Sequence, residues 1–224
     1  MVTITETTDD GYLPALRFHF LTRLYDPAIR LTTREARFKG MLIEQAELRP
    51  GQRVLDLGCG TGTLAIEAKR RQPDAEVAGL DADPEMLAQA ERKAETAGVK
   101  LDLTEGLSTE LPYDEASFDR VLSTLFFHHL EPEPKRRTAR EIARVLRPGG
   151  ELHVADWGPP SDPVMSLAFL GIRALDGFSN TEDNQRGALP AIFAAAGMSP
   201  ALETDRLRTP FGTLALYRAT RAAT

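Results

Sequence analysis

The chain has 224 residues and a formal charge of −6, with 42% hydrophobic and 27% charged residues. This length suits one domain with a complete core, and the balance is that of an ordinary globular protein. The negative charge argues against a general nucleic-acid surface, which is normally basic. A local basic cluster exists at Lys135, Arg136, Arg137 and Arg140, and we favour a solvated helix face over a binding patch there.

The single cysteine, Cys59, excludes an intrachain disulfide and a cysteine-cluster metal site. No apolar run approaches the roughly 18 residues that a transmembrane helix requires. Residues 1–6 lack the basic start and apolar core of a signal peptide. We therefore expect a cytoplasmic protein without a transmembrane segment, and we predict no metal site.

Two amphipathic helices are predicted ahead of the first strand. Apolar side chains recur at helical spacing over residues 12–29, at Leu13, Leu16, Phe20, Leu24 and Ala28. Thr32 to Glu35 fits a capping box, which starts a second helix that ends at residues 48–51. We expect these helices to cover the ligand-binding edge of the first strand.

Strands and helices then alternate regularly. Strands are predicted at 53–57, 75–80, 99–103, 119–124 and 151–156, with helices at 63–71, 84–97 and 134–146 and a short one at 109–116. Asp83, Pro84 and Gly98 suit the cap, first turn and end of the helix at 84–97. The run from Arg147 to Gly150 ends the helix before the fifth strand. Such alternation predicts a parallel sheet covered by helices on both faces.

After Trp157 the pattern changes to a rigid loop at 158–163, helices at 164–175 and 184–196, and strands at 201–208 and 212–219. We predict an α/β fold: a doubly wound, mostly parallel seven-stranded sheet with an N-terminal helical cover and a helical insertion after the fifth strand. We predict one domain over 1–224. It consists of the cover (1–47), a binding core (48–157), a lid and helix (158–200) and a strand pair (201–224).

The stretch Val54–Gly62 is the most informative part of the chain. An apolar run holds Asp56 and ends in glycines at positions 58, 60 and 62. Glycines let the backbone turn sharply and leave amides open to a ligand, and the helix that follows points its N-terminal amides the same way. A lone Gly-x-Gly is weak, but the flanking strand and helix and a second acid downstream predict a pocket for a nucleotide-like cofactor.

Two acids narrow the choice of ligand. Asp81 ends the second strand near the offset at which doubly wound folds place an acid on ribose hydroxyls, whereas helix capping suits Asp83 better. Asp56 lies in an apolar strand, where an unpaired carboxylate is costly, so it requires a cation or a hydrogen-bond network. Thr63 also stands where the dinucleotide fingerprint has glycine. These features favour a nucleoside linked to an amino acid over NAD, and they disfavour an oxidoreductase.

The chain resembles the class I S-adenosylmethionine (SAM) methyltransferases, particularly the small-molecule branch that includes ubiquinone and menaquinone C-methyltransferases. The matching segments are Val54–Gly62, Gly79–Asp81, Leu111–Pro112, Ser117–Asp119, His128–Leu130 and Arg144–Gly150. The resemblance implies a Rossmann-like methyltransferase fold, SAM as cofactor and S-adenosylhomocysteine as product.

The resemblance also implies which residues bind SAM. The glycines would pass beneath its methionine and ribose parts, Asp56 would hold the ammonium group, and Asp81 the ribose. Ala82 and Met86 would pack beside adenine, and the end of the fourth strand would offer backbone carbonyls. The full set is Asp56, Gly58, Cys59, Gly60, Gly62, Asp81, Ala82, Met86, Leu107, Ser108, Ser123 and Thr124. Cys59 is interpreted as a small residue of the turn and not as a nucleophile.

One position departs from the family pattern. The usual Gly-Asp-Ala after the third strand, whose acid receives the adenine amino group, is replaced by Gly106-Leu107-Ser108. Leu107 can cover the ring but cannot accept that hydrogen bond through its side chain. Three alternatives stay open: Ser108 accepts it, Glu105 accepts it, or packing and backbone hold adenine alone.

Methyl transfer by in-line displacement relies mainly on positioning, and it needs a general base only for a poorly ionised hydroxyl or a carbon acid. His128 and His129 follow the fourth strand and are the candidate bases. The alternative is that one of them caps the next helix or packs in the core. His153 is expected to be buried. The candidate substrate residues are Phe18, Tyr25, Phe127, Asp156 and Trp157.

We therefore predict SAM-dependent methyl transfer to a small, partly apolar acceptor, with O- or C-methylation favoured. The alternative is a SAM-fold protein that binds the cofactor without transferring methyl, as a scaffold or a non-methylating catalyst. The expected partner is a small-molecule acceptor and not nucleic acid, and the expected state is a monomer or homodimer.

Overall fold

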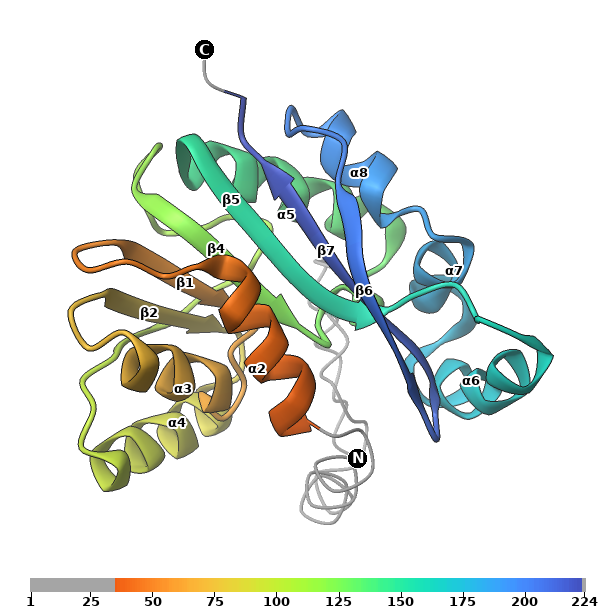
Figure 1. The fold of residues 1–224 in the computed structure, drawn as a ribbon, viewed down its shortest axis with the longest axis horizontal. Helices are drawn as coiled ribbons and strands as arrows, with labels where there is room; N and C mark the ends of the chain where they lie inside the picture. Colours follow the sequence, from red (N-terminus) through yellow and green to blue (C-terminus); the bar gives the residue numbers. More distant parts are fainter. Residues whose placement is uncertain (1–34, 223–224) are drawn as a thin grey trace, which may run out of the picture.

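The computed structural model describes residues 35–222, so the predicted helix at 12–29 and Thr32 to Arg34 of the capping box lie outside the described residues. Seven strands form one sheet in the order β3-β2-β1-β4-β5-β7-β6 (Figure 1). Their bounds are β1 Arg53–Leu57, β2 Glu76–Asp81, β3 Asp102–Glu105, β4 Phe118–Thr124, β5 Leu146–Trp157, β6 Leu202–Thr209 and β7 Gly212–Thr220.

The sheet is mixed. Strands β1 to β5 pair in parallel, β7 runs antiparallel to β5, and β6 runs antiparallel to β7. The chain moves outward from β1 to β3 and then crosses back to β4 on the other side of β1. Ligands of open α/β sheets bind at such a reversal, beyond the carboxyl ends of the strands. The fold therefore places a crevice beyond Leu57 and Thr124.

Helices cover both faces of the sheet (Figure 1). Those described are α2 Glu35–Ala46, α3 Thr63–Arg71, α4 Pro84–Ala97, α5 Pro132–Val145, α6 Pro163–Asp176, α7 Phe178–Arg186 and α8 Leu189–Ala195, with a short 3₁₀ helix, η1, at Phe127–His129. Apolar side chains of α2, α3 and α6 share one core cluster with the sheet, and those of α5 and α8 share the other. The inner strands are thus buried from both sides, which explains the apolar character of β1, β2, β4 and β7. The edge strands β3 and β6 are more exposed.

The helix predicted at 84–97 is confirmed at both ends. The Asp83 side chain accepts the amides of Glu85 and Met86, Pro84 occupies the first turn, and Gly98 ends the helix with φ +66°. The helix predicted at 63–71 also matches α3. Local capping chemistry determines α4, whereas α3 follows Gly62 directly and has no side-chain cap.

Four elements differ from the predictions by more than two residues. The strand predicted at 99–103 is β3, which runs from Asp102 to Glu105. Residues 109–116 form no helix, since Pro112 interrupts the segment and Ala116 has φ +53°. The helix predicted at 184–196 is two helices, because Gly187 ends α7 with φ +72° and Pro190 lies in the first turn of α8. Strand β5 begins at Leu146 and not at 151, and its pairing with β4 is irregular between Phe118 and Arg120.

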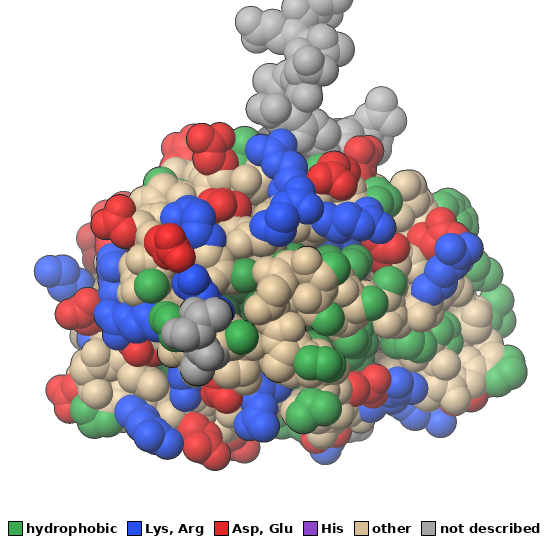
Figure 2. All heavy atoms as spheres, turned by 90° about the horizontal axis from the view of Figure 1, so that it is seen from above, with side chains coloured by type: hydrophobic (Ala, Val, Ile, Leu, Met, Phe, Trp, Pro, Cys, Tyr) green, Lys and Arg blue, Asp and Glu red, His purple; other side chains and the backbone are tan. Residues whose placement is uncertain are grey.

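Lys135 corrects the interpretation of the basic cluster as a solvated face. Its side chain is fully buried, and Nζ donates to the carbonyl of Asn180 (2.8 Å) and to Asn184 Oδ1 (3.1 Å) on α7. Arg136, Arg137 and Arg140 are exposed as expected. On the face in Figure 2, basic and acidic side chains lie interspersed and form no single basic patch. Within residues 35–222, no helix is long and apolar enough to cross a membrane.

Candidate cofactor and acceptor site

The loop between β1 and α3 depends on its glycines. Gly58, Gly60 and Gly62 have φ of +69°, +52° and +71°, in the left-handed region that favours glycine. A Cβ on Gly62 would lie 2.8 Å from Cβ of Ala90, so this glycine lets α4 pack against the loop. A Cβ on Gly60 would have no atom within 4 Å among the described residues, so the loop faces open space there.

Asp81 connects this loop to the start of α4. One carboxylate oxygen accepts the amide of Gly60 (2.7 Å), and the other accepts the amide of Asp83 (3.0 Å). Burial raises the pKa of Asp81, while these backbone hydrogen bonds oppose the shift. The carboxylate therefore lies at the edge of the crevice with its position set from two sides.

Asp56 is a buried acid with one oxygen left over. Its side chain is 1% exposed, and Oδ2 accepts the amide of Ala65 (3.0 Å) in α3. Oδ1 has no hydrogen-bond partner within residues 35–222. Burial raises the pKa of Asp56 to about 7, although Lys39 lowers it. A buried, half-satisfied carboxylate is costly unless a cation or donor pairs with it.

A cleft opens beside this loop at the end of the sheet. It is lined by Gly58, Leu80, Asp81, Ala82, Gly106, Leu107, Ser108, Thr109, Phe126, Leu130 and Pro134. Ser108 Oγ is hydrogen-bonded to Thr138 Oγ1 at 2.8 Å, which leaves the hydroxyl pair with further bonding capacity. Met86 and Glu105 are not in the lining, whereas Leu107 and Ser108 are.

The residues at the end of β4 and just after it lie beside the glycine loop. Ser123 is buried, and its hydroxyl donates to the carbonyl of Leu57 (2.9 Å), which joins β4 to β1. Leu125 has φ +51°, a strained conformation for a branched residue, and its amide donates to Ala155. The Phe126 ring then lies so close to the loop that a Cβ on Gly58 would be 2.3 Å from it.

Asp156, the residue before the end of β5, organises the segment that follows β4. Its side chain is fully buried. Oδ2 accepts the amides of Phe126 (3.1 Å) and Phe127 (2.7 Å), and Oδ1 accepts Nδ1–H of His128 (2.7 Å) and the amide of Trp157 (2.7 Å). Burial alone would raise the pKa of Asp156, but His128 holds it below the usual range. One carboxylate thus fixes η1 and the His128 ring together.

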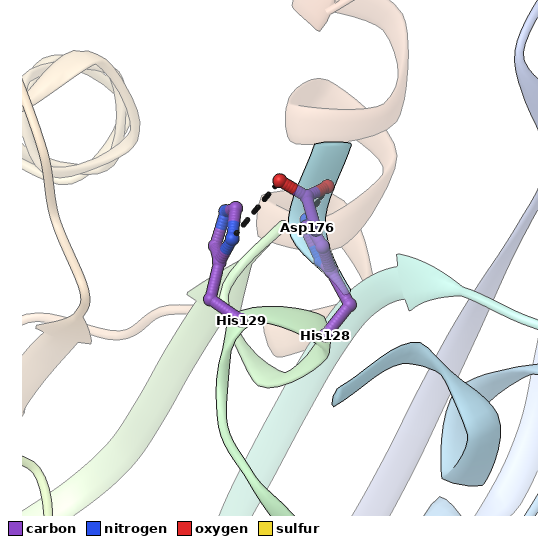
Figure 3. A group of neighbouring side chains, drawn as sticks. All are labelled: His128, His129 and Asp176. Atoms are coloured by element: carbon purple, nitrogen blue, oxygen red, sulfur yellow. Dashed lines mark ion pairs between the residues drawn. The ribbon is translucent and has the colours of Figure 1, made fainter. Parts of the chain in front are cut away.

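His128, His129 and Asp176 point toward one another, two from η1 and one from the last residue of α6 (Figure 3). His128 Nε2 lies 3.6 Å from Asp176 Oδ2, and His129 Nδ1 lies 3.6 Å from Asp176 Oδ1. Burial lowers the pKa of His128, but Asp156 and Asp176 outweigh it and raise it. Burial and the charge of His128 lower the pKa of His129. Burial raises the pKa of Asp176.

Comparisons with known proteins agree with this geometry. The family described as "Methyltransferase domain" matches residues 54–150. Demethylmenaquinone methyltransferase of Thermus thermophilus is 36% identical over 155 residues, which cover 69% of this chain and 67% of that protein. The enzyme of the same name from Deinococcus radiodurans is 37% identical, over 53% of this chain and 48% of its own length.

The chain belongs to the class I SAM-dependent methyltransferases. Solved structures show the same fold. The SAM-dependent methyltransferase of Aquifex aeolicus superposes with a TM-score of 0.66 at 19% identity, over 91% of this chain and 97% of that one. The [4+2]-cyclase SpnF superposes with a TM-score of 0.65 at 23% identity, over 84% and 82%. The fold of this methyltransferase therefore does not by itself determine the reaction.

Among the described residues, the predicted substrate residues Phe127 and Trp157 lie outside the cleft lining. Phe18 and Tyr25 lie outside the described residues. Phe127 is buried in the core against Phe193, with ring centroids 5.2 Å apart. Trp157 is buried against Phe169 and His128. The neighbouring Phe126 lines the cleft instead.

The expectations that His153 is buried and that Cys59 is not a nucleophile agree with the structure of this methyltransferase. His153 is fully buried on β5, where Gln45 lies 2.9 Å from its Nδ1. Cys59 is buried under the loop, and burial raises the pKa of its thiol. A buried thiol with a raised pKa is a poor nucleophile, which fits a residue chosen for its small size.

Asp176 and Lys135 are the polar residues that sequence reasoning missed. Asp176 is the last residue of α6, at the negative end of the helix dipole, where an acid is unfavourable without a cationic partner. Lys135 shares one helix face with the buried Thr138, Ala139 and Ile142. Both signals were present in the sequence, because an acid at a helix end and a lysine in an apolar stripe each require a partner.

Proposed function

We propose that this methyltransferase transfers a methyl group from SAM to a small, partly apolar acceptor, at oxygen or carbon. The observation that carries the proposal is the unpartnered, buried Oδ1 of Asp56 beside a glycine loop that faces open space. A buried acceptor of this kind suits the ammonium group of an amino acid. The residues present therefore fit SAM.

Each part of the cofactor has candidate residues. Asp56 would hold the ammonium group, and the Gly58–Gly62 loop would lie beneath the methionine and ribose parts. Asp81 would accept the ribose hydroxyls. Ala82 and Leu107 would pack against adenine, and the Ser108–Thr138 hydroxyl pair is the nearest polar replacement for the missing family acid. Bound SAM supplies an electrophilic methyl group; the protein positions the acceptor and excludes water.

The acceptor side of the cleft rests on η1. In the sequence, His128 and His129 lie between Phe126 and Leu130, which both line the cleft, while the two histidines are not in its lining. His129 is the more accessible of the two, with a side chain 29% exposed against 4% for His128. We propose that this pair contacts the acceptor or its ionisable group, and that Asp156 positions His128.

The test is turnover. Purified protein would be incubated with SAM and a panel of quinols, phenols and enolic ketones, and S-adenosylhomocysteine and methylated product would be measured by mass spectrometry. We expect product with at least one apolar hydroxyl or enol acceptor, and far less product for an Asp81→Ala control at the same SAM concentration.

Two outcomes would contradict the proposal. SAM binding without turnover on the whole panel would favour a SAM-fold protein that does not transfer methyl. Thermal stabilisation by NADH but not by SAM would instead exclude SAM as the cofactor. Calorimetry with S-adenosylhomocysteine separates these two cases before any acceptor is tried.

A further inference from the structure

We propose that His128, His129 and Asp176 bind a divalent first-row transition metal ion, through His128 Nε2, His129 Nδ1 and the Asp176 carboxylate. The sequence alone predicted no metal site. It could not show that the last residue of α6 meets the two histidines of η1 (Figure 3).

The three ligand atoms are already close together. One ligand atom from each of the three residues lies within 4.8 Å of the other two, and His128 Nε2 and His129 Nδ1 each lie 3.6 Å from a carboxylate oxygen of Asp176. Bonds of about 2.0–2.2 Å from zinc to nitrogen and oxygen place tetrahedral ligands roughly 3.4 Å apart. Side-chain shifts of about 1 Å or less therefore bring the cluster to metal-binding geometry.

His128 is oriented in the way that metal-bound histidines usually are. Its Nδ1–H donates to Asp156, which leaves the Nε2 lone pair facing Asp176. Such a carboxylate behind the ring fixes the tautomer and increases the basicity of the ligating nitrogen. Asp156 is itself held by the amides of Phe126, Phe127 and Trp157, so the ring orientation is determined by backbone contacts.

The buried carboxylate of Asp176 also requires a cationic partner. Its side chain is only 9% exposed, and Oδ2 is buried without a hydrogen-bond partner among residues 35–222. It ends α6, where the helix dipole adds negative potential, and a second buried acid, Asp156, lies behind His128. A divalent ion would offset two buried carboxylates at one point.

The donor set indicates the class of ion. Two imidazole nitrogens and one carboxylate suit zinc or iron(II), whereas magnesium and calcium prefer sites made of oxygen alone. Three protein ligands leave open coordination positions, as in catalytic rather than structural sites. The partly exposed His129 ring provides a route for entry.

The role of the ion rests on the proposed function, whereas its binding does not. An acceptor hydroxyl or enol oxygen at an open position would lose its proton to solvent more readily, and the resulting oxyanion would be the nucleophile. The two imidazoles would then be ligands and not the general bases predicted from the sequence. This would favour acceptors whose oxygen can reach the ion.

The test measures metal binding in the absence of SAM and acceptor, so a failure of methyl transfer cannot affect it. Full-length protein without a histidine tag would be treated with chelator, and Zn²⁺ titrated by calorimetry. We expect one ion per chain. Co²⁺ would serve as a visible probe, with absorption typical of nitrogen and oxygen ligands and no thiolate band, since Cys59 is the single cysteine of the chain.

Variants assign the site. Asp176→Asn and His129→Gln should each weaken Zn²⁺ binding by at least about 10-fold, while the matched control Glu182→Gln, a more exposed acid on neighbouring α7, should bind as the unmodified protein does. Circular dichroism would verify folding, and if Asp176→Asn does not fold, the more exposed His129→Gln carries the test. No saturable Zn²⁺ binding, or equal affinity in the site variants and the control, would overturn the proposal in favour of a purely ionic His–Asp cluster.

Discussion

The two sides of the cleft satisfy their buried charges in different ways. On the β1–β2 side, Asp56 accepts an amide nine residues further on, and Asp81 accepts the amides of Gly60 and Asp83. On the β4–β5 side, Asp156 accepts amides from residues 29 and 30 positions earlier, and Lys135 donates to residues 45 and 49 positions later. We refer to these as the glycine side and the histidine side.

Asp56 on one side and Asp156 and Lys135 on the other differ in what they leave free. The glycine side keeps an unpartnered Asp56 oxygen and open space at Gly60. The histidine side uses every oxygen of Asp156 and two strong hydrogen bonds of Lys135 to hold segments of its own chain together. We therefore expect substitution of Asp81, the candidate ribose ligand, to change cofactor binding, and substitution of Lys135 to change folding stability.

The largest expected effect concerns Asp56 and pH. Its folded pKa of about 7 lies above its ordinary value of 3.8, so the folded state binds the extra proton and loses stability as pH rises from about 4 to 7. Relative to Asp56→Asn, the unmodified protein should lose about 1.4 kcal/mol per pH unit over that range, and nothing more above it. Urea unfolding of both proteins across this range measures the slope.

Comparison of the unmodified protein with Asp56→Asn also tests whether Asp56 is retained for ligand binding. At pH 8 we expect Asp56→Asn to be the more stable protein but the weaker binder of S-adenosylhomocysteine. The exposed substitution Asp74→Asn should change neither property. A pH-independent stability difference between the unmodified protein and Asp56→Asn would contradict the assignment of the buried charge.

Lys135→Met tests the histidine side. The change removes a buried cation and leaves its acceptors on α7 without a donor, so we expect a loss of about 3 kcal/mol in the free energy of unfolding. Arg136→Met is the matched control on the exposed face of the same helix and should stay within about 0.5 kcal/mol. Equal stability of the two variants would contradict the inference that Lys135 stabilises the histidine side.

Asp81→Ala tests the glycine side. Loss of charged hydrogen bonds to the ribose should weaken S-adenosylhomocysteine binding by about 100-fold, measured by calorimetry. Asp83→Ala removes the α4 cap and should cost about 1 kcal/mol of stability with little change in affinity. If both variants bind alike, Asp81 is a structural acid and not a ribose ligand.

The smallest expected effect is on stability, and it distinguishes backbone strain at positive φ from the packing of Gly62 against Ala90. Gly62→Ala and Gly51→Ala both place a side chain at positive φ (+71° and +75°), but only at Gly62 does the new Cβ meet Ala90. Gly62→Ala should therefore be the more destabilising by about 1 kcal/mol in urea unfolding. Adding Ala90→Gly should recover part of that difference, and no recovery would mean that the contact is not the cause.

The glycine side was readable from the sequence because its interactions are local. Gly58, Gly60 and Gly62, the acids Asp56 and Asp81, and the Asp83 cap all act within one β-α-β unit, so spacing alone brings them together. The ends of α4 were predicted for the same reason, since Asp83 and Gly98 adjoin them, and α3 begins directly after Gly62.

The histidine side was only half readable. His128 and His129 were visible as a pair, but Asp176 meets them only after α6 has crossed the end of the sheet. Phe126 and Phe127 are adjacent, and only the turn set by Leu125 and Asp156 decides that Phe126 faces the cleft. Lys135 was assigned to solvent because three arginines nearby suggested a charged face. The sequence could indicate that Asp176 and Lys135 require partners, but the partners lie at long sequence separations, which periodicity does not encode.

Lys135 has a consequence for exchanging parts between relatives. The segment from α6 to α7 carries Asp176, and α7 docks on α5 through acceptors that suit an ammonium group. A segment transplanted from another methyltransferase would bring its own α7. The surface of α5 beneath it would still present the buried ammonium group of Lys135, whether or not the new α7 carries oxygens that accept its hydrogen bonds. The stability of such a chimera therefore depends on Lys135 of α5, which lies outside the segment that would be exchanged to change the acceptor preference.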